Sequence, residues 1–132
     1  MGDKAIIMAV DDNAMQLKTF QGILAPQYDV RVVKSAADAE GLLNEITVDV
    51  ILLDIEMPNI SGFEFLHDVR KMPRYMNVPI IVVSGHTEPE FLEAVRSSSA
   101  AGVLTKPVQP EALVEAIEKV LADSSPKNPF GL

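Results

Sequence analysis

Val48-Asp49-Val50-Ile51-Leu52-Leu53-Asp54 is the stretch that decides the fold, and Ile55-Glu56-Met57-Pro58 follows it directly. Residues 48–53 have one polar side chain, that of Asp49, which is typical of a strand buried on both faces in a parallel sheet. Asp54 places an ionisable group at the end of this strand, and Pro58 cannot continue the strand's hydrogen-bond ladder. Because ligands bind at strand ends in open α/β sheets, the surroundings of Asp54 are the first place to look for function.

The composition is that of an ordinary soluble domain. The chain has 132 residues, with 48% hydrophobic and 23% charged residues, which suits one domain with its own core. Cysteine is absent, so disulfides and thiolate chemistry are excluded, and two histidines are too few for a histidine-built zinc site. The net charge of -8 opposes direct binding to nucleic acid or to an anionic membrane. With no transmembrane run and no signal peptide, the cytoplasm is the expected compartment.

Strand-like and helix-like segments alternate along the chain. The expected strands are residues 5–10, 28–33, 48–53, 79–83 and 102–105, each followed by apolar residues at helical spacing. Asn13 and Ser35 are expected to cap the first two helices, Thr87 and Glu90 to form a capping box, and Pro110 to open the last helix. Asn59, Ser61 and Gly62 are expected to form a turn. Five strands alternating with five helices predict an α/β fold with helices on both faces of a parallel sheet.

Polar groups follow four of the five expected strands: Asp11 and Asp12 the first, Asp54 the third, Ser84 the fourth and Lys106 the fifth. In a parallel sheet these strand ends share one edge. Three carboxylates there would repel one another, and a hard cation such as Mg²⁺ would relieve the repulsion. A lysine and a hydroxyl suit an oxyanion such as phosphate. The pattern predicts a pocket for Mg²⁺ and a phosphoryl group beside a nucleophilic carboxylate.

Each of these groups also has an ordinary structural explanation. Asp11 and Asp12 are compatible with a helix cap, Ser84 with a turn, and Lys106 with a solvated surface charge. The joint pattern is more specific than its parts, because four separate strands place compatible groups on one edge.

On these motifs the chain resembles the receiver domains of two-component response regulators, of the chemotaxis-regulator type. The resemblance covers roughly residues 4–122, and it rests on Asp11-Asp12, on residues 52–58 with Gly62 beyond, on Ser84-Gly85 and on Lys106-Pro107. It implies a flavodoxin-like, doubly wound, five-stranded parallel sheet of order 2-1-3-4-5.

The resemblance also implies a role for each acidic residue. Asp54 would accept a phosphoryl group from a phosphohistidine on a sensor histidine kinase or a histidine phosphotransfer protein. Asp11, Asp12 and Asp54 would hold Mg²⁺ through their carboxylates, and Glu56 would contribute its backbone carbonyl. The product would be a labile mixed anhydride and therefore a timed switch.

The remaining positions are implied to bind phosphate and to switch. Lys106 would pair with a phosphoryl oxygen, and Ser84, followed by Gly85, would move toward the phosphoryl group and pass the signal outward. Val103 stands where the family usually has an aromatic residue, so a swinging ring cannot report the signal here. Smaller repacking of the fourth helix, fifth strand and fifth helix, or backbone shifts, are expected instead. The Lys106-Pro107 bond is often cis in the family, which the sequence leaves open.

Glu56 and His86 lie two residues after Asp54 and Ser84, respectively. In the family such positions tune the lifetime of the phosphoryl group, so we predict that both set the hydrolysis rate by shaping the access of water. The alternative is that they are merely exposed loop residues.

Three functional classes compete. The favoured one is a receiver that catalyses only its own phosphoryl transfer and dephosphorylation. A phosphohydrolase or phosphotransferase with Asp54 as nucleophile would typically have a second aspartate where Glu56 stands, and a cap region that this chain lacks. Intact Asp54 and Lys106 count against a phosphorylation-independent binding module. Flavin binding is disfavoured because the acidic loop 11–13 lacks glycine and hydroxyl donors.

The sequence does not indicate which molecule or domain receives the signal. Residues 1–122 are expected to form the receiver domain, and residues 123–132 a flexible tail or a truncated linker that contains Pro126 and Pro129. The chain would act on a downstream protein target or a fused output domain, and a phosphorylation-dependent homodimer stays open.

Overall fold

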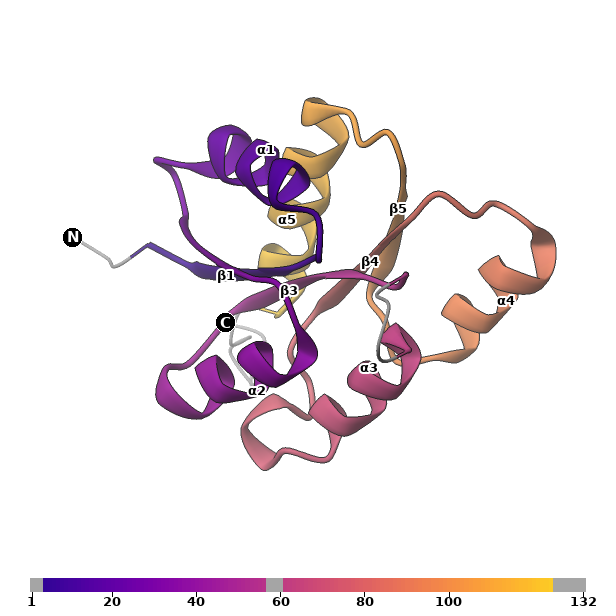
Figure 1. Ribbon diagram of the computed structural model, residues 1–132, viewed down its shortest axis with the longest axis horizontal. Coiled ribbons are helices and arrows are strands. Elements are labelled where there is room, and N and C mark those ends of the chain that lie inside the picture. Colours follow the sequence, from indigo (N-terminus) through magenta and orange to yellow (C-terminus); the bar gives the residue numbers. More distant parts are fainter. Residues whose placement is uncertain (1–3, 57–60, 125–132) are drawn as a thin grey trace, which may run out of the picture.

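The computed structural model describes residues 4–56 and 61–124, and within them the predicted α/β fold is confirmed. One parallel sheet has the strand order β2-β1-β3-β4-β5, the doubly wound order that the resemblance implies (Figure 1). The strands are β1 (Ile6–Val10), β2 (Asp29–Val33), β3 (Val50–Asp54), β4 (Ile80–Ser84) and β5 (Gly102–Thr105).

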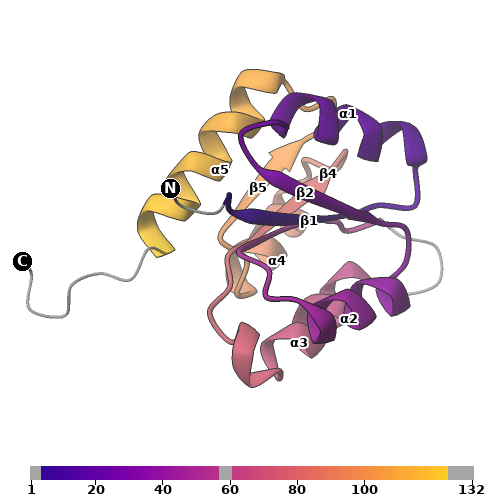
Figure 2. The same ribbon diagram turned by 90° about the vertical axis from the view of Figure 1, so that its left-hand side faces the viewer.

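Helices cover both faces of the sheet. They are α1 (Ala14–Leu24), α2 (Ala36–Glu45), α3 (Gly62–Arg70), α4 (Pro89–Ser97) and α5 (Pro110–Ser124), with a short 3-10 helix η1 (Pro73–Tyr75) after α3. Figures 1 and 2 show α1 and α5 on one face and α2, α3 and α4 on the other. No helix in these described ranges is long and apolar enough to cross a membrane.

The apolar strands supply two separate cores because successive side chains point to opposite faces. The core under α2 and α3 includes Met8, Ile51, Val82 and Phe65, and the core under α1 and α5 includes Ile7, Leu52, Ile81 and Leu113. All five residues of β3 and of β4 are buried, which explains why both read as nearly continuous apolar runs.

Two strands, β3 and β4, extend one residue further at their carboxyl ends than predicted. Asp54 is the last residue of β3 and Ser84 the last of β4, whereas both were expected just beyond the strands. Their side chains are therefore fixed by the ladder, and they are 3% and 0% exposed.

The predicted caps are partly confirmed. The side chain of Asn13 accepts hydrogen bonds from two backbone N–H groups at the start of α1, and Ser35 accepts one from Asp38 at 3.0 Å. The prediction of a capping box at Thr87 and Glu90 is wrong. The N-cap of α4 is Glu88, which makes no side-chain cap bond because its carboxylate faces the ring of His86.

A capping box does occur at α3, where the sequence suggested only a turn. The Ser61 hydroxyl accepts from the backbone N–H of Phe63 at 3.1 Å, and the Glu64 carboxylate accepts from the backbone N–H of Ser61 at 3.4 Å. Asn59, the other residue of the expected turn, lies outside the described residues. So do residues 125–132 of the expected tail, whereas Asp123 and Ser124 end α5.

Gly62 starts α3 in close contact with the end of β3. A Cβ atom at this position would lie 2.6 Å from the Cα of Ile55, so a larger residue does not fit without backbone movement. The contact fixes the start of α3 next to the strand that ends in Asp54.

We expect Gly62→Ala to lower the free energy of unfolding by about 1–3 kcal/mol, because α3 must move away from Ile55. The matched control is Gly41→Ala in α2, where a Cβ meets nothing within 4 Å in the part of the chain that the structure describes. It should raise stability by about 0.5–1 kcal/mol, since alanine is the better helix former. Urea unfolding followed by circular dichroism measures both, and equal effects of the two substitutions would contradict the close contact at Gly62.

Candidate functional site

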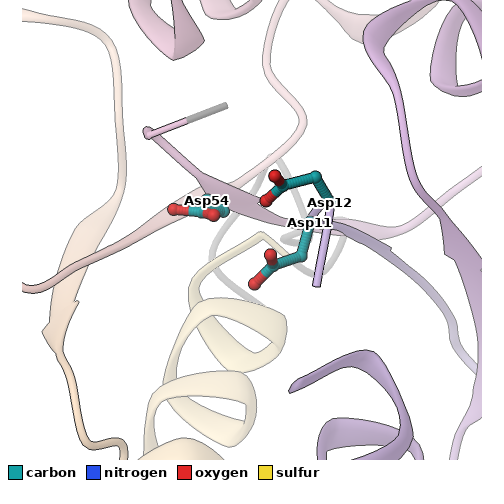
Figure 3. A group of neighbouring side chains, drawn as sticks. All are labelled: Asp11, Asp12 and Asp54. Carbon is teal, nitrogen blue, oxygen red and sulfur yellow. The ribbon is translucent and has the colours of Figure 1, made fainter. Parts of the chain in front are cut away.

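Three carboxylates meet at the carboxyl ends of β1 and β3 (Figure 3). One oxygen each from Asp11, Asp12 and Asp54 lies within 4.8 Å of the other two. The register explains this meeting, because Val10 of β1 pairs with Leu53 of β3 and the next residues are Asp11 and Asp54. Asp11 and Asp54 are buried, whereas Asp12 is exposed and opens the cluster to solvent.

The buried carboxylate of Asp11 is only half satisfied. Its Oδ1 accepts a hydrogen bond from the backbone N–H of Asn13 at 2.9 Å, whereas its Oδ2 is buried without a partner among the described residues. Burial is the main cause that raises the pKa of Asp11 to about 6. The Asn13 hydrogen bond opposes this shift, and the charge of Asp54 adds to it. A partnerless buried oxygen beside two more carboxylates fits a cluster that could hold a metal cation.

Lys106 lies beside the same carboxylates. Its Nζ is 3.4 Å from Asp54 Oδ1, which also accepts from the backbone N–H of Glu56 at 3.1 Å. The backbone N–H of Lys106 donates to the Ser84 carbonyl at 2.8 Å and so ties the end of β5 to the end of β4. The Lys106–Pro107 peptide bond is cis.

Ser84 is linked to both residues that were predicted to tune hydrolysis. Its hydroxyl donates to Glu56 Oε2 at 3.2 Å and accepts from the backbone N–H of His86 at 3.0 Å. The ring of His86 lies with Nε2 2.6 Å from the same Glu56 oxygen and with Nδ1 3.1 Å from Glu88 Oε2. Sequence reasoning missed Glu88, although an acid two residues after a histidine was the available signal.

Gly85 and Val103 lie outside this network. Gly85 is exposed directly after β4. Val103 is 37% exposed and pairs in register with Val82, two residues before the Ser84–Thr105 pair. It lines a cavity of about 620 Å³ together with Arg70 and Lys119, and none of the clustered aspartates lines that cavity.

The chain is similar to known signalling proteins. The model of the response regulator receiver domain matches residues 7–118. The transcriptional regulatory protein DegU of Brevibacillus brevis is 32% identical over 121 residues, covering 89% of this chain and 50% of DegU. The polar-differentiation response regulator DivK of Brucella ovis is 27% identical over 119 residues, covering 89% of this chain and 97% of DivK. The structure of the chemotaxis protein CheY4 of Vibrio cholerae matches with a TM-score of 0.85 and 31% identity, covering 90% of this chain and 100% of that one.

Fold and site together define the class of protein, a doubly wound α/β domain with an acidic cluster at the carboxyl edge of its sheet. The chain belongs to the response regulator receiver domain family, so it is a receiver domain of two-component systems. The resemblance that the motifs indicated is thereby confirmed. The chain spans between 16% and 50% of the first curated relatives that it matches.

In Mg²⁺-free buffer at pH 7, we expect Asp11→Asn to raise the free energy of unfolding by about 1–2 kcal/mol. The pKa of Asp11 rises on folding from 3.8 to about 6, so the ionised side chain destabilises the folded state above that range. The wild-type protein should therefore lose stability from this group as the pH rises from about 4 to 6, and the variant should not.

Urea unfolding between pH 4 and 7 measures this difference. Asp12→Asn is the matched control, because the side chain of Asp12 is exposed and loses little hydration on folding. A destabilised Asp11→Asn variant at pH 7 would contradict the destabilising role of the buried charge.

Proposed function

We propose that Asp54 accepts a phosphoryl group from a phosphohistidine donor and that the modified domain then switches conformation. The observation that supports this most directly is the buried Asp54 carboxylate between an acidic cluster and Lys106 at one sheet edge. Family membership and the likeness to response regulators support the same role.

The acidic cluster is the proposed Mg²⁺ site. The carboxylates of Asp11, Asp12 and Asp54 would hold the ion together with the backbone carbonyl of Glu56. This donor set is supported by Oδ2 of Asp11, which has no partner within residues 4–56 and 61–124. When bound, Mg²⁺ would neutralise charge that develops on the transferred group.

The side chains of this chain then have separate tasks. An oxygen of Asp54 attacks the phosphorus atom, a P–O bond forms, the P–N bond breaks, and its electron pair returns to the donor imidazole. Lys106, which lies 3.4 Å from Asp54 Oδ1, would turn its ammonium to a phosphoryl oxygen. Ser84 would donate its hydroxyl hydrogen to another phosphoryl oxygen, with Gly85 next to it leaving the approach unobstructed. Burial of Asp54 limits the access of water to the new anhydride.

The partners follow from this chemistry. A sensor histidine kinase or a histidine phosphotransfer protein would supply the phosphoryl group, and a downstream protein or a fused output domain would receive the signal. The chain covers 50% of DegU, which suits a receiver joined to a further domain, and 97% of DivK, which suits a receiver that acts on a separate protein. We propose residues 1–122 as the receiver domain, with α5 extending beyond them to Ser124, and a phosphorylation-dependent homodimer as one output.

Incubation with acetyl phosphate and Mg²⁺, followed by intact mass spectrometry, tests the phosphoryl transfer. We expect one phosphoryl group on the wild-type chain, none after Asp54→Ala, none in EDTA, and an unchanged level after Asp38→Asn, an exposed aspartate in α2. Absence of the modification in the wild type would overturn the proposal. Sustained turnover of p-nitrophenyl phosphate would favour the phosphohydrolase instead.

We further propose that Glu56 and His86 set the hydrolysis rate, because both side chains lie over the Ser84 side of the site. After removal of acetyl phosphate, the loss of the phosphoryl group should change severalfold in Glu56→Ala and His86→Ala. Decay curves that superimpose on that of the wild type would reject this role.

A further inference from the structure

The hydroxyl of Ser84 donates its hydrogen bond to one carboxylate oxygen of Glu56. Glu56 Oε2 accepts the Ser84 hydroxyl hydrogen at 3.2 Å and lies 2.6 Å from His86 Nε2. The Ser84 oxygen in turn accepts the backbone N–H of His86 at 3.0 Å. Each of these three residues thus contacts the other two. We call Glu56, Ser84 and His86 the latch; it joins the end of β4 to the segment that follows β3.

The latch reaches the helices through the ring of His86. Its centroid lies 5.6 Å from that of Phe91 in α4, and Phe91 lies 6.1 Å from Phe63 in α3. Nδ1 of His86 faces Glu88, the N-cap of α4, at 3.1 Å. A movement of His86 therefore acts directly on the first turn of α4.

We propose that Glu56 and His86 position the Ser84 hydroxyl in the resting state, and that phosphorylation of Asp54 opens this latch and displaces His86 with the start of α4. The proposal rests on the proposed function, since it describes the regulation of the same site. Glu56 and His86 act through Ser84 and are positioning residues.

Competition for one hydrogen is the physical basis of the latch. A serine hydroxyl has a single O–H donor, so Ser84 cannot donate to Glu56 and to a phosphoryl oxygen at once. The backbone N–H of Glu56 bonds Asp54 Oδ1 at 3.1 Å, so a phosphoryl group on Asp54 arrives close to the Glu56 residue. The phosphoryl group carries up to two negative charges in place of the single charge of the Asp54 carboxylate, and this added charge would repel the Glu56 carboxylate.

The latch also provides a path by which the signal passes from the site to the helices, which Val103 cannot provide. Val103 has no ring to swing, and it is separated along β5 from the residue that pairs with Ser84. His86 is bonded to Ser84 through its backbone and packs on Phe91 through its ring. The aromatic reporter therefore sits in the loop between β4 and α4 instead of in β5.

Backbone amide resonances in ¹⁵N-labelled protein, recorded without Mg²⁺ or phosphodonor, test the latch. In Glu56→Ala and in His86→Phe, which keeps a ring against Phe91, the amides of Ser84 and Phe91 should move toward their positions in the phosphorylated wild type, as should the amide of His86 in Glu56→Ala. Glu56→Gln keeps an acceptor for Ser84 and should restore the resting positions. Labelling of Asp54 by acetyl phosphate should quicken about fivefold in Glu56→Ala, the ratio expected for the loss of one ordinary hydrogen bond.

Two controls separate the latch from general effects. His67→Phe in α3 and Glu45→Ala in α2 replace exposed residues of the same types and should leave resonances and labelling rate unchanged. Wild-type amide positions and an unchanged labelling rate in Glu56→Ala and His86→Phe, with normal labelling of Asp54, would overturn the latch alone. Failure of the wild type to be labelled would overturn the proposed function and the latch with it.

Discussion

The structure depends on the meeting of two buried carboxylates, Asp11 and Asp54, at neighbouring strand ends. Like charges in a buried place are unfavourable, and Lys106 at 3.4 Å compensates only part of that charge. The oxygen of Asp11 that has no partner among the described residues indicates the same imbalance. The fold tolerates it because β1, β3 and β4 bury apolar side chains on both faces, and that burial is the dominant favourable term in folding. Stability is thus given up at the place where a cation and a phosphoryl group are proposed to bind.

The sheet fixes this site more rigidly than loops would. Asp54 and Ser84 are the last residues of their strands, so the ladder sets the direction of each side chain. Gly62 adds a second constraint, because its contact with Ile55 holds α3 against the end of β3. The groups on which the chemistry depends therefore sit on a rigid frame, while Glu56 and His86 lie in the segments after the strands.

Much of the fold could be predicted from the sequence, for reasons visible in particular residues. The apolar runs around Ile7, Leu52 and Ile81 have no polar face, and parallel strands covered on both sides explain them. Strand order came from the family motifs, since periodicity does not determine which strands are neighbours. The capping box at Thr87 failed because Glu88 interacts with His86, a contact that local patterns do not contain. The box at Ser61 was overlooked because Gly62 suggested a turn, whereas glycine is needed there for close packing.

Site residues that follow from strand ends could be predicted, but the links between them could not. Glu56 and Ser84 are separated by 28 positions, and no sequence rule states that their side chains meet across two loops. The departure at Val103 was visible, yet its consequence appears only when the ring of His86 is seen against Phe91. An imidazole held between two carboxylates and an aromatic ring connects the edge of the sheet to α4. Since the hydroxyl that a phosphoryl group would engage is the one that Glu56 holds, the phosphoryl group and Glu56 compete for the same hydrogen bond, and this competition couples chemistry at Asp54 to movement of α4.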